Sequence, residues 1–147
     1  MRIAIGSDHA GFALKEKIKA FLLAEKFDVV DYGTHSPESV DYPDIAAQVA
    51  NAIKTNEAEQ GILLCKTGIG MSIVANKFSG IRAALCRSET DAQLAKAHNN
   101  ANILVLSGEF TPENLAMKIV KTFLQTEFEK GGRHERRVQK IHQLTGR

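Results

Sequence analysis

The stretch GILLCKTGIGMS, residues 61–72, decides the fold, because an apolar run passes directly into a glycine-rich turn. Residues 61–65 form a short continuous apolar run, as is typical of a strand covered on both faces in a parallel sheet. Gly68 and Gly70 follow at once, and residues 72–77 are expected to form a short helix. The pattern places Cys65 at the carboxyl end of a buried strand, next to a turn that allows close approach of the backbone.

On both sides of this stretch, β-type runs alternate with amphipathic helical runs. Strands are expected at residues 2–7, 28–33, 61–65, 81–86 and 101–108, and longer helices at 11–26, 44–54, 88–99, 111–128 and about 134–144. The helix at 111–128 has the clearest start, with Thr111 as N-cap and Pro112 at the first helical position. The alternation predicts a three-layer α/β/α Rossmann-like sandwich with about five parallel strands, formed by residues 1–147 as a single domain.

Composition narrows the class of protein. The chain has 147 residues, of which 44% are hydrophobic and 24% are charged, as expected of one globular domain. No run approaches the ~18 apolar residues of a membrane span, and the first residues lack the features of a signal peptide, so a cytoplasmic location is expected. Two cysteines, Cys65 and Cys86, form no metal-binding or disulfide pattern, and Cys86 is expected to lie in the core.

A basic tail closes the chain. Residues 130–147 contain six Lys and Arg against one Glu, a net charge of +5, so the remaining residues carry −3 of the overall +2. Arg133 and Arg137 are four residues apart and share one face of a helix, an arrangement suited to phosphate. A solvated basic helix is the alternative. Nucleic acid is disfavoured, because no aromatic residues lie between the basic ones and the rest of the chain is acidic.

Ligands of open parallel sheets bind beyond the carboxyl ends of the strands, so reactive side chains that follow a strand are the candidates for a site. Asp8 and His9 follow the first strand, and such a pair can orient a sugar hydroxyl; alternatively, Asp8 only caps the next helix. The turn after Cys65 offers backbone amides as an anion cradle, whose positive potential favours a thiolate. The alternative is a structural turn beside a buried thiol. His98 is either a general acid or a helix-terminal cation.

Taken together, five segments resemble one family in their order along nearly the whole chain. They are GSDHAG (6–11), VDYPDIA (40–46), GILLCKTGIGMSIVANKFSGIRAAL (61–85), AHNNANIL (97–104) and GGRHERR (131–137). The family is that of the type B ribose-5-phosphate isomerases, which includes galactose-6-phosphate and allose-6-phosphate isomerases. The resemblance implies an enzyme of the pentose phosphate pathway that interconverts ribose 5-phosphate and ribulose 5-phosphate through a cis-enediolate, without metal or organic cofactor. From composition and charge, neither a nucleic-acid nor a membrane partner is expected.

The resemblance also assigns roles to residues. It implies that Cys65 abstracts the proton, that the Thr67–Gly70 backbone holds the enediolate charge, and that His98 helps to open the sugar ring. The residues it places around substrate are Asp8, His9, Tyr42, Lys66, Thr67, Gly68, Ile69, Gly70, Asn99, Arg133 and Arg137. The two arginines, on the tail 130–147, are expected to come from a neighbouring subunit, which requires a homodimer, with a tetramer as a further state.

Three residues depart from the family pattern: Lys66 in place of a frequent glycine, Glu109 in place of a frequent arginine that binds phosphate, and an additional Lys130. A carboxylate at 109 repels phosphate, and we expect Lys66 or Lys130 to offset that repulsion. Two other functions therefore stay open at this stage. One is isomerisation of a hexose 6-phosphate of the allose or galactose type, and the other is a non-catalytic phosphosugar-binding module.

Overall fold

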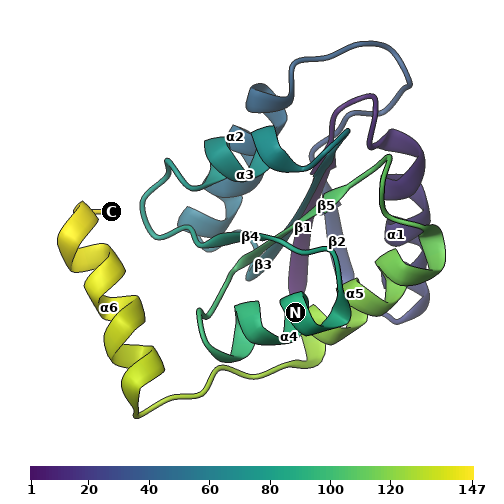
Figure 1. Cartoon of the computed structure of the whole chain (residues 1–147). Coiled ribbons are helices and arrows are strands. Elements are labelled where there is room, and N and C mark those ends of the chain that lie inside the picture. Colours follow the sequence, from purple (N-terminus) through teal and green to yellow (C-terminus); the bar gives the residue numbers. More distant parts are fainter.

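The computed structural model describes residues 1–147 and contains five strands and six helices (Figure 1). The strands are β1 (Arg2–Ser7), β2 (Asp28–Asp31), β3 (Gln60–Cys65), β4 (Ala83–Leu85) and β5 (Ile103–Ser107). The helices are α1 (Phe12–Ala24), α2 (Tyr42–Lys54), α3 (Ile69–Ala75), α4 (Glu89–Ala97), α5 (Glu113–Gln125) and α6 (Arg133–Thr145). Every strand and helix expected from the sequence is present, with changes at several ends.

The five strands form one sheet in the order β2-β1-β3-β5-β4, and every neighbouring pair is parallel. Strand β3 is central, with β1 on one side and β5 on the other. Its side chains alternate between the two faces of the sheet. Ile62 and Leu64 pack into one apolar cluster, while Leu63 and Cys65 pack into the other. The continuous apolar run at 61–65 is therefore explained by burial on both faces.

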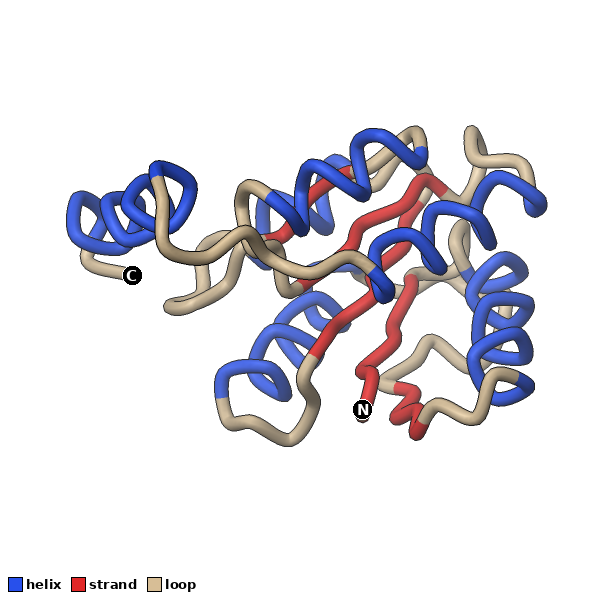
Figure 2. Tube along the Cα trace, turned by 90° about the horizontal axis from the view of Figure 1, so that it is seen from below, coloured by secondary structure: helices blue, strands red, loops and turns tan.

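Helices cover both faces of the sheet, which confirms the three-layer α/β/α prediction (Figure 2). Helices α1, α4 and α5 pack on one face through a cluster that includes Ile18 and Phe123, both fully buried. Helices α2 and α3 pack on the other face through a cluster that includes Val49 and Met71. Cys86 lies in the first cluster and is 1% exposed, as expected of a core thiol.

Three helix starts differ from the predictions. Helix α5 begins at Glu113, with Pro112 rather than Thr111 at the N-cap, and no side chain caps it. Helix α2 begins at Tyr42 instead of residue 44, because Pro43 occupies a position in the first turn where its missing N–H costs nothing. Helix α3 begins at Ile69, directly after the glycine turn, rather than at residue 72.

Helix α6 stands apart from the body of the molecule, at the end of an extended segment (Figures 1 and 2). Val138 is its one buried residue, and its exposed apolar side chains include Ile141 and Leu144. A cleft of about 750 Å³ separates the helix from the body and is lined in part by Ile73, Phe78 and Ile141. None of the helices is long and apolar enough to cross a membrane.

A buried ion pair at the end of β2 was not expected from the sequence. The Nζ atom of Lys15, whose side chain is fully buried, lies 2.6 Å from Oδ2 of Asp31, and Lys19 Nζ approaches the same oxygen at 3.1 Å. The amide of Gly33 donates to Oδ1. Burial acts to raise the pKa of Asp31, but the hydrogen bonds from Lys15, Gly33 and Lys19 outweigh it and hold this pKa below its ordinary value.

We predict that Asp31→Asn lowers the free energy of unfolding by about 3 kcal/mol, because it leaves the Lys15 ammonium buried without its closest carboxylate. Asp28→Asn on the same strand is the control, since the pair of Asp28 with Arg2 is exposed and its loss should cost little. Urea unfolding at pH 7 measures both.

The contribution of Asp31 should also depend on pH. Because its folded pKa is depressed, the stabilisation is present above the unfolded value of 3.8 and is lost as pH falls through the lower folded value. Equal unfolding midpoints for the two variants at pH 7 would contradict the assignment of Asp31 as the buried partner.

Candidate active site

The carboxyl ends of β1, β3 and β5 lie side by side, since these strands are neighbours in the sheet. Cys65 ends β3, and the loops that follow β1 and β5 flank it. The amide of Asp8 donates to the carbonyl of Leu64 at 3.2 Å, and the amide of Gly108 donates to the carbonyl of Cys65 at 2.8 Å. Cys65 therefore lies at the edge of the sheet where open parallel folds bind their ligands.

The turn after Cys65 is held by short contacts of its own. The amide of Gly68 donates to the Cys65 Sγ at 3.2 Å, and the amide of Ile69 donates to Oγ1 of Thr67, also at 3.2 Å. Gly68 has φ of +81°, and a Cβ atom there would lie 2.6 Å from the Leu85 side chain. Only glycine fits both the conformation and the space, so the sequence at this position determines the path of the turn.

Two backbone donors at the start of α3 have no acceptor. The amides of Gly70 and Met71 make no hydrogen bond within the chain, as is usual for the first amides of a helix. The ring of Tyr42 lies against this turn, since a Cβ atom on Gly70 would be 2.6 Å from it. A thiol and two free amides are thus grouped at one place, an arrangement that can hold negative charge on a substrate oxygen.

Asp8 and His9 hold the loop between β1 and α1. Oδ1 of Asp8 accepts hydrogen bonds from the amides of Ala10 at 3.0 Å and Gly11 at 3.1 Å, so Asp8 does have the local capping role. Its other oxygen makes no hydrogen bond within the chain. Nδ1 of the exposed His9 accepts from the amide of Val40 at 3.3 Å, which joins this loop to the segment before α2. Both side chains lie at the same edge of the sheet as Cys65.

Lys66 and Glu109, the two departures from the family pattern, form an ion pair with Nζ and Oε2 3.5 Å apart. Both side chains are at least half exposed. Their backbones are also joined, since the amide of Glu109 donates to the carbonyl of Lys66 at 3.2 Å. Lys66 was expected to offset the repulsion between Glu109 and phosphate. Its ammonium instead pairs with the Glu109 carboxylate itself, and the pair adds no net charge beside Cys65.

His98 and Asn99 lie at the opposite edge of the sheet. His98 ends α4, and the chain then enters β5, which runs in register with β3 until Ser107 pairs with Cys65. The paired residues from Ile103 to Ser107 span four strand steps, or roughly 13 Å. Within one chain, His98 and Cys65 are thus separated by the length of the sheet and do not face the same substrate.

Arg133 and Arg137 accompany His98 rather than Cys65. The amide of Glu129 donates to the carbonyl of Ala97 at 3.0 Å, which holds the segment before α6 against the end of α4 (Figure 1). The side chains of both arginines are exposed and make no ion pair or hydrogen bond within the chain. The predicted site residues therefore form two groups, one around Cys65 and the other around His98 with Asn99 and the two arginines.

Sequence reasoning missed two members of the second group, Glu129 and His134. The ring of His134 stacks on that of His98, with centroids 3.9 Å apart and planes 7° apart. Burial lowers the pKa of His134, and the neighbouring His98 adds to this effect. His134 could have been found from the sequence, because it lies between Arg133 and Arg137, whereas nothing in the sequence pointed to Glu129.

Comparison with known proteins identifies the family. The chain matches the family model described as Ribose/Galactose Isomerase over residues 3–141, and it belongs to that family. It is 46% identical over 140 residues to a protein of Escherichia coli named ribose-5-phosphate isomerase B, a match that covers 95% of this chain and 93% of the relative.

Solved structures agree with this family. A ribose-5-phosphate isomerase B of Clostridium thermocellum superposes with a TM-score of 0.97 at 49% identity, covering 99% of this chain and 98% of the other. A Mycoplasma genitalium ribose-5-phosphate isomerase B, solved with bound ribulose 5-phosphate, gives a TM-score of 0.94 at 45% identity and covers 99% and 96% of the two chains.

The two thiols should differ in reactivity. Burial raises the pKa of Cys86 to about 12, and Asp91 adds to the effect, so roughly one molecule in ten thousand carries its thiolate at pH 8. Cys65 lies beside the free amides of the glycine turn. We predict that iodoacetamide alkylates Cys65 well before Cys86, as measured by peptide mass spectrometry over time.

A Cys65→Ser variant provides the control for this experiment and should lose the fast phase of labelling. Faster labelling of Cys86 than of Cys65 in the folded protein would contradict the placement of the largely buried Cys65 thiol beside the free amides at the carboxyl end of β3.

Proposed function

We propose that the protein is an aldose–ketose isomerase that interconverts ribose 5-phosphate and ribulose 5-phosphate. The observation that carries this proposal is the Cys65 thiol beside the unpaired amides of Gly70 and Met71 at the carboxyl end of β3. The name of the Escherichia coli relative and the ribulose 5-phosphate bound to the Mycoplasma protein support the choice of substrate.

The reaction requires removal of a proton from the carbon next to the carbonyl group. Cys65, as its thiolate, takes this proton, and negative charge moves onto the neighbouring oxygen to give a cis-enediolate. The amides of Gly70 and Met71 stabilise that charge, with the hydroxyl of Thr67 beside them. A proton then moves from O2 to O1, and return of the abstracted proton to C1 completes the exchange of aldose and ketose without a metal or an organic cofactor.

The remaining roles are divided between the two edges of the sheet. Near Cys65, the free oxygen of Asp8 accepts a hydrogen bond from a sugar hydroxyl, and His9 and Tyr42 border the sugar. The imidazole of His98 transfers the proton that opens the furanose ring, and Asn99 contacts the opened sugar. Arg133 and Arg137 bind the phosphate, so that the non-reacting end of the substrate is held while C1 and C2 react.

A homodimer unites these two groups, with the second group supplied by the neighbouring chain. Three features support it: the separation of His98 from Cys65 by the sheet, the unpaired Arg133 and Arg137, and the exposed apolar residues of α6. The cleft of about 750 Å³ beneath α6 offers further surface for a partner. The protein then acts in the cytoplasm, in the pentose phosphate pathway.

A hexose 6-phosphate is the second candidate substrate, and the Lys66–Glu109 pair is the observation that favours it. A carboxylate near the phosphate is unfavourable, whereas it can accept a hydrogen bond from an additional hydroxyl group. Values of kcat/KM for ribose 5-phosphate, allose 6-phosphate and galactose 6-phosphate distinguish the two. A higher kcat/KM for allose 6-phosphate or galactose 6-phosphate than for ribose 5-phosphate would make that hexose phosphate the proposed substrate.

The test of the reaction itself is Cys65→Ala. We predict a loss of kcat of at least ~10³-fold, because the variant lacks the base that removes the proton, with ribose 5-phosphate binding largely intact by calorimetry. Cys86→Ala is the matched control, since it removes a thiol from the core and should leave kcat near that of the parent protein.

Near-normal kcat in Cys65→Ala would contradict the assignment of the base. Binding of sugar phosphates by the parent protein without turnover of any of them would instead favour a non-catalytic phosphosugar-binding module.

A further inference from the structure

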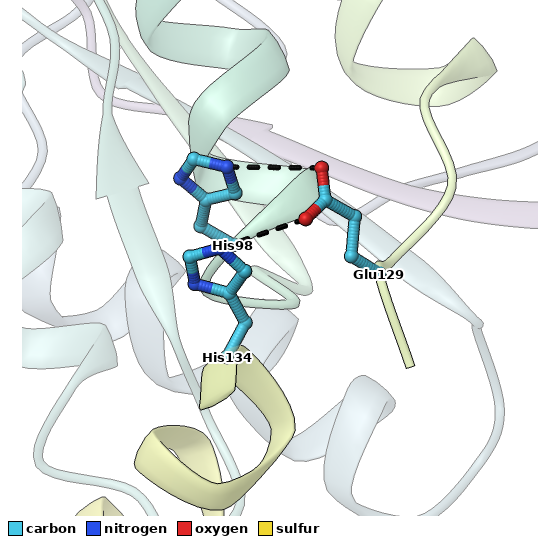
Figure 3. A group of neighbouring side chains, drawn as sticks. All are labelled: His98, Glu129 and His134. Atoms are coloured by element: carbon cyan, nitrogen blue, oxygen red, sulfur yellow. Dashed lines mark ion pairs between the residues drawn. The ribbon is translucent and has the colours of Figure 1, made fainter. Parts of the chain in front are cut away.

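Three side chains from three segments converge at the edge of the sheet opposite Cys65 (Figure 3). His98 ends α4, Glu129 lies in the segment between α5 and α6, and His134 lies in the first turn of α6. Figure 3 shows the two rings one above the other, with the carboxylate beside both. One ligand atom from each residue lies within 4.8 Å of the other two.

The contacts among these side chains are too long for hydrogen bonds. Nε2 of His98 is 3.8 Å from Oε1 of Glu129, and Nε2 of His134 is 3.5 Å from Oε2 of the same carboxylate. N–H···O hydrogen bonds measure about 2.7–3.2 Å. None of the three side chains makes a hydrogen bond elsewhere in the chain. Three potential ligands therefore face one another through a ring stack and two long ion-pair contacts, without a hydrogen bond among them.

The spacing is close to that of a tetrahedral metal centre. Zinc binds histidine nitrogen at about 2.0–2.1 Å and carboxylate oxygen at about 2.0–2.2 Å, which places neighbouring ligand atoms roughly 3.4 Å apart. The observed separations are 3.8 Å from His98 to Oε1 and 3.5 Å from His134 to Oε2 of Glu129, and one ligand atom from each residue lies within 4.8 Å of the other two. The three ligand atoms must therefore close by up to roughly 1.4 Å around one ion. The rings, now 7° from parallel, must tilt so that both nitrogens point to one ion, and the exposure of His98 and Glu129 leaves room for this.

We propose that His98, Glu129 and His134 bind a divalent transition-metal ion of the zinc type, and that the bound ion inhibits the enzyme by occupying His98. Two histidines and one carboxylate leave a fourth position for water, as in open zinc sites. The segment before α6 is already anchored, because the Glu129 amide donates to the carbonyl of Ala97. The binding part stands on this geometry alone, whereas the inhibitory part rests on the proposed function.

The bound ion inhibits because it occupies the imidazole of His98, which the proposed reaction also needs to open the sugar ring. A nitrogen bound to the ion has no lone pair or proton to offer, so Nε2 of His98, which faces Glu129, cannot transfer the ring-opening proton while the ion is present. Arg133 and Arg137 share the first turns of α6 with His134, so the ion also lies next to the groups proposed to bind phosphate. The ion is thus an inhibitor that competes with sugar phosphate for this edge, and is not a cofactor.

Cobalt serves as the spectroscopic probe and zinc as the inhibitor. The EDTA-treated, full-length protein is titrated with Co²⁺ while visible absorption is followed, and with Zn²⁺ by calorimetry. We expect one ion per chain with the absorption of a tetrahedral site. Glu129→Gln should weaken binding more than about 100-fold, because loss of an outer-shell partner alone costs about 10–100-fold. Glu127→Gln, an exposed carboxylate two residues away, is the matched control and should bind as the parent does.

The same variants are used to measure how zinc affects isomerase activity. Activity in zinc is expressed for each variant as a fraction of its own activity in EDTA, whatever that activity is. Zinc should lower this fraction in the parent protein and in Glu127→Gln, with recovery on addition of EDTA, whereas the fraction should stay near one in Glu129→Gln at the same zinc concentration. Cys65→Ala should still bind Co²⁺, which excludes the catalytic thiol as the ligand.

The outcomes separate the two parts of the proposal. Unchanged Co²⁺ binding in Glu129→Gln, or loss of binding in Cys65→Ala, would overturn the site. Full activity of the zinc-bound parent would overturn the inhibition while leaving the site in place. If the parent has no isomerase activity at all, Glu129-dependent binding still establishes the metal site, and the inhibitory part fails together with the proposed function.

Discussion

All five strands run in the same direction, and this constraint organises the rest of the molecule. A chain that forms a parallel sheet must return to the starting edge before each new strand, so segments that follow strands gather at one edge and segments that precede strands gather at the other. Cys65 and the glycine turn belong to the first edge, whereas His98 belongs to the second. No change of side-chain rotamer brings them together.

The two edges carry complementary chemistry. One has a thiol and free amides, which suit removal of a proton and stabilisation of the resulting charge. The other has imidazoles, a carboxylate and two unpaired arginines, which suit transfer of a second proton and binding of phosphate. A sugar phosphate needs both sets at once. In the proposed homodimer, pairing of two chains meets this need. The proposed metal site uses the same grouping of imidazoles with Glu129 at the second edge.

The bounds of the two inner strands β1 and β3 were predicted from the sequence more accurately than those of the other strands. Strands β1 and β3 were predicted almost residue for residue, because burial on both faces imposes an apolar run. The edge strands β2 and β4 were predicted too long, since each pairs with one neighbour and its sequence is less constrained. The inner strand β5 was also predicted too long, at 101–108 against Ile103–Ser107. The Cys65 turn was found because its residues are contiguous, whereas the Asp31–Lys15 pair and the Glu129–His98 contact depend on packing between distant segments.

The central claim, that each site combines Cys65 of one chain with His98 of another, is tested most directly by mixing two inactive variants. Cys65→Ala and His98→Asn chains are refolded together in equal amounts, and isomerase activity is compared with that of each variant alone. If sites are shared, each mixed dimer contains one intact site, and the mixture recovers about a quarter of the parent activity. If each chain holds a complete site, mixing restores nothing, and that result would contradict the account.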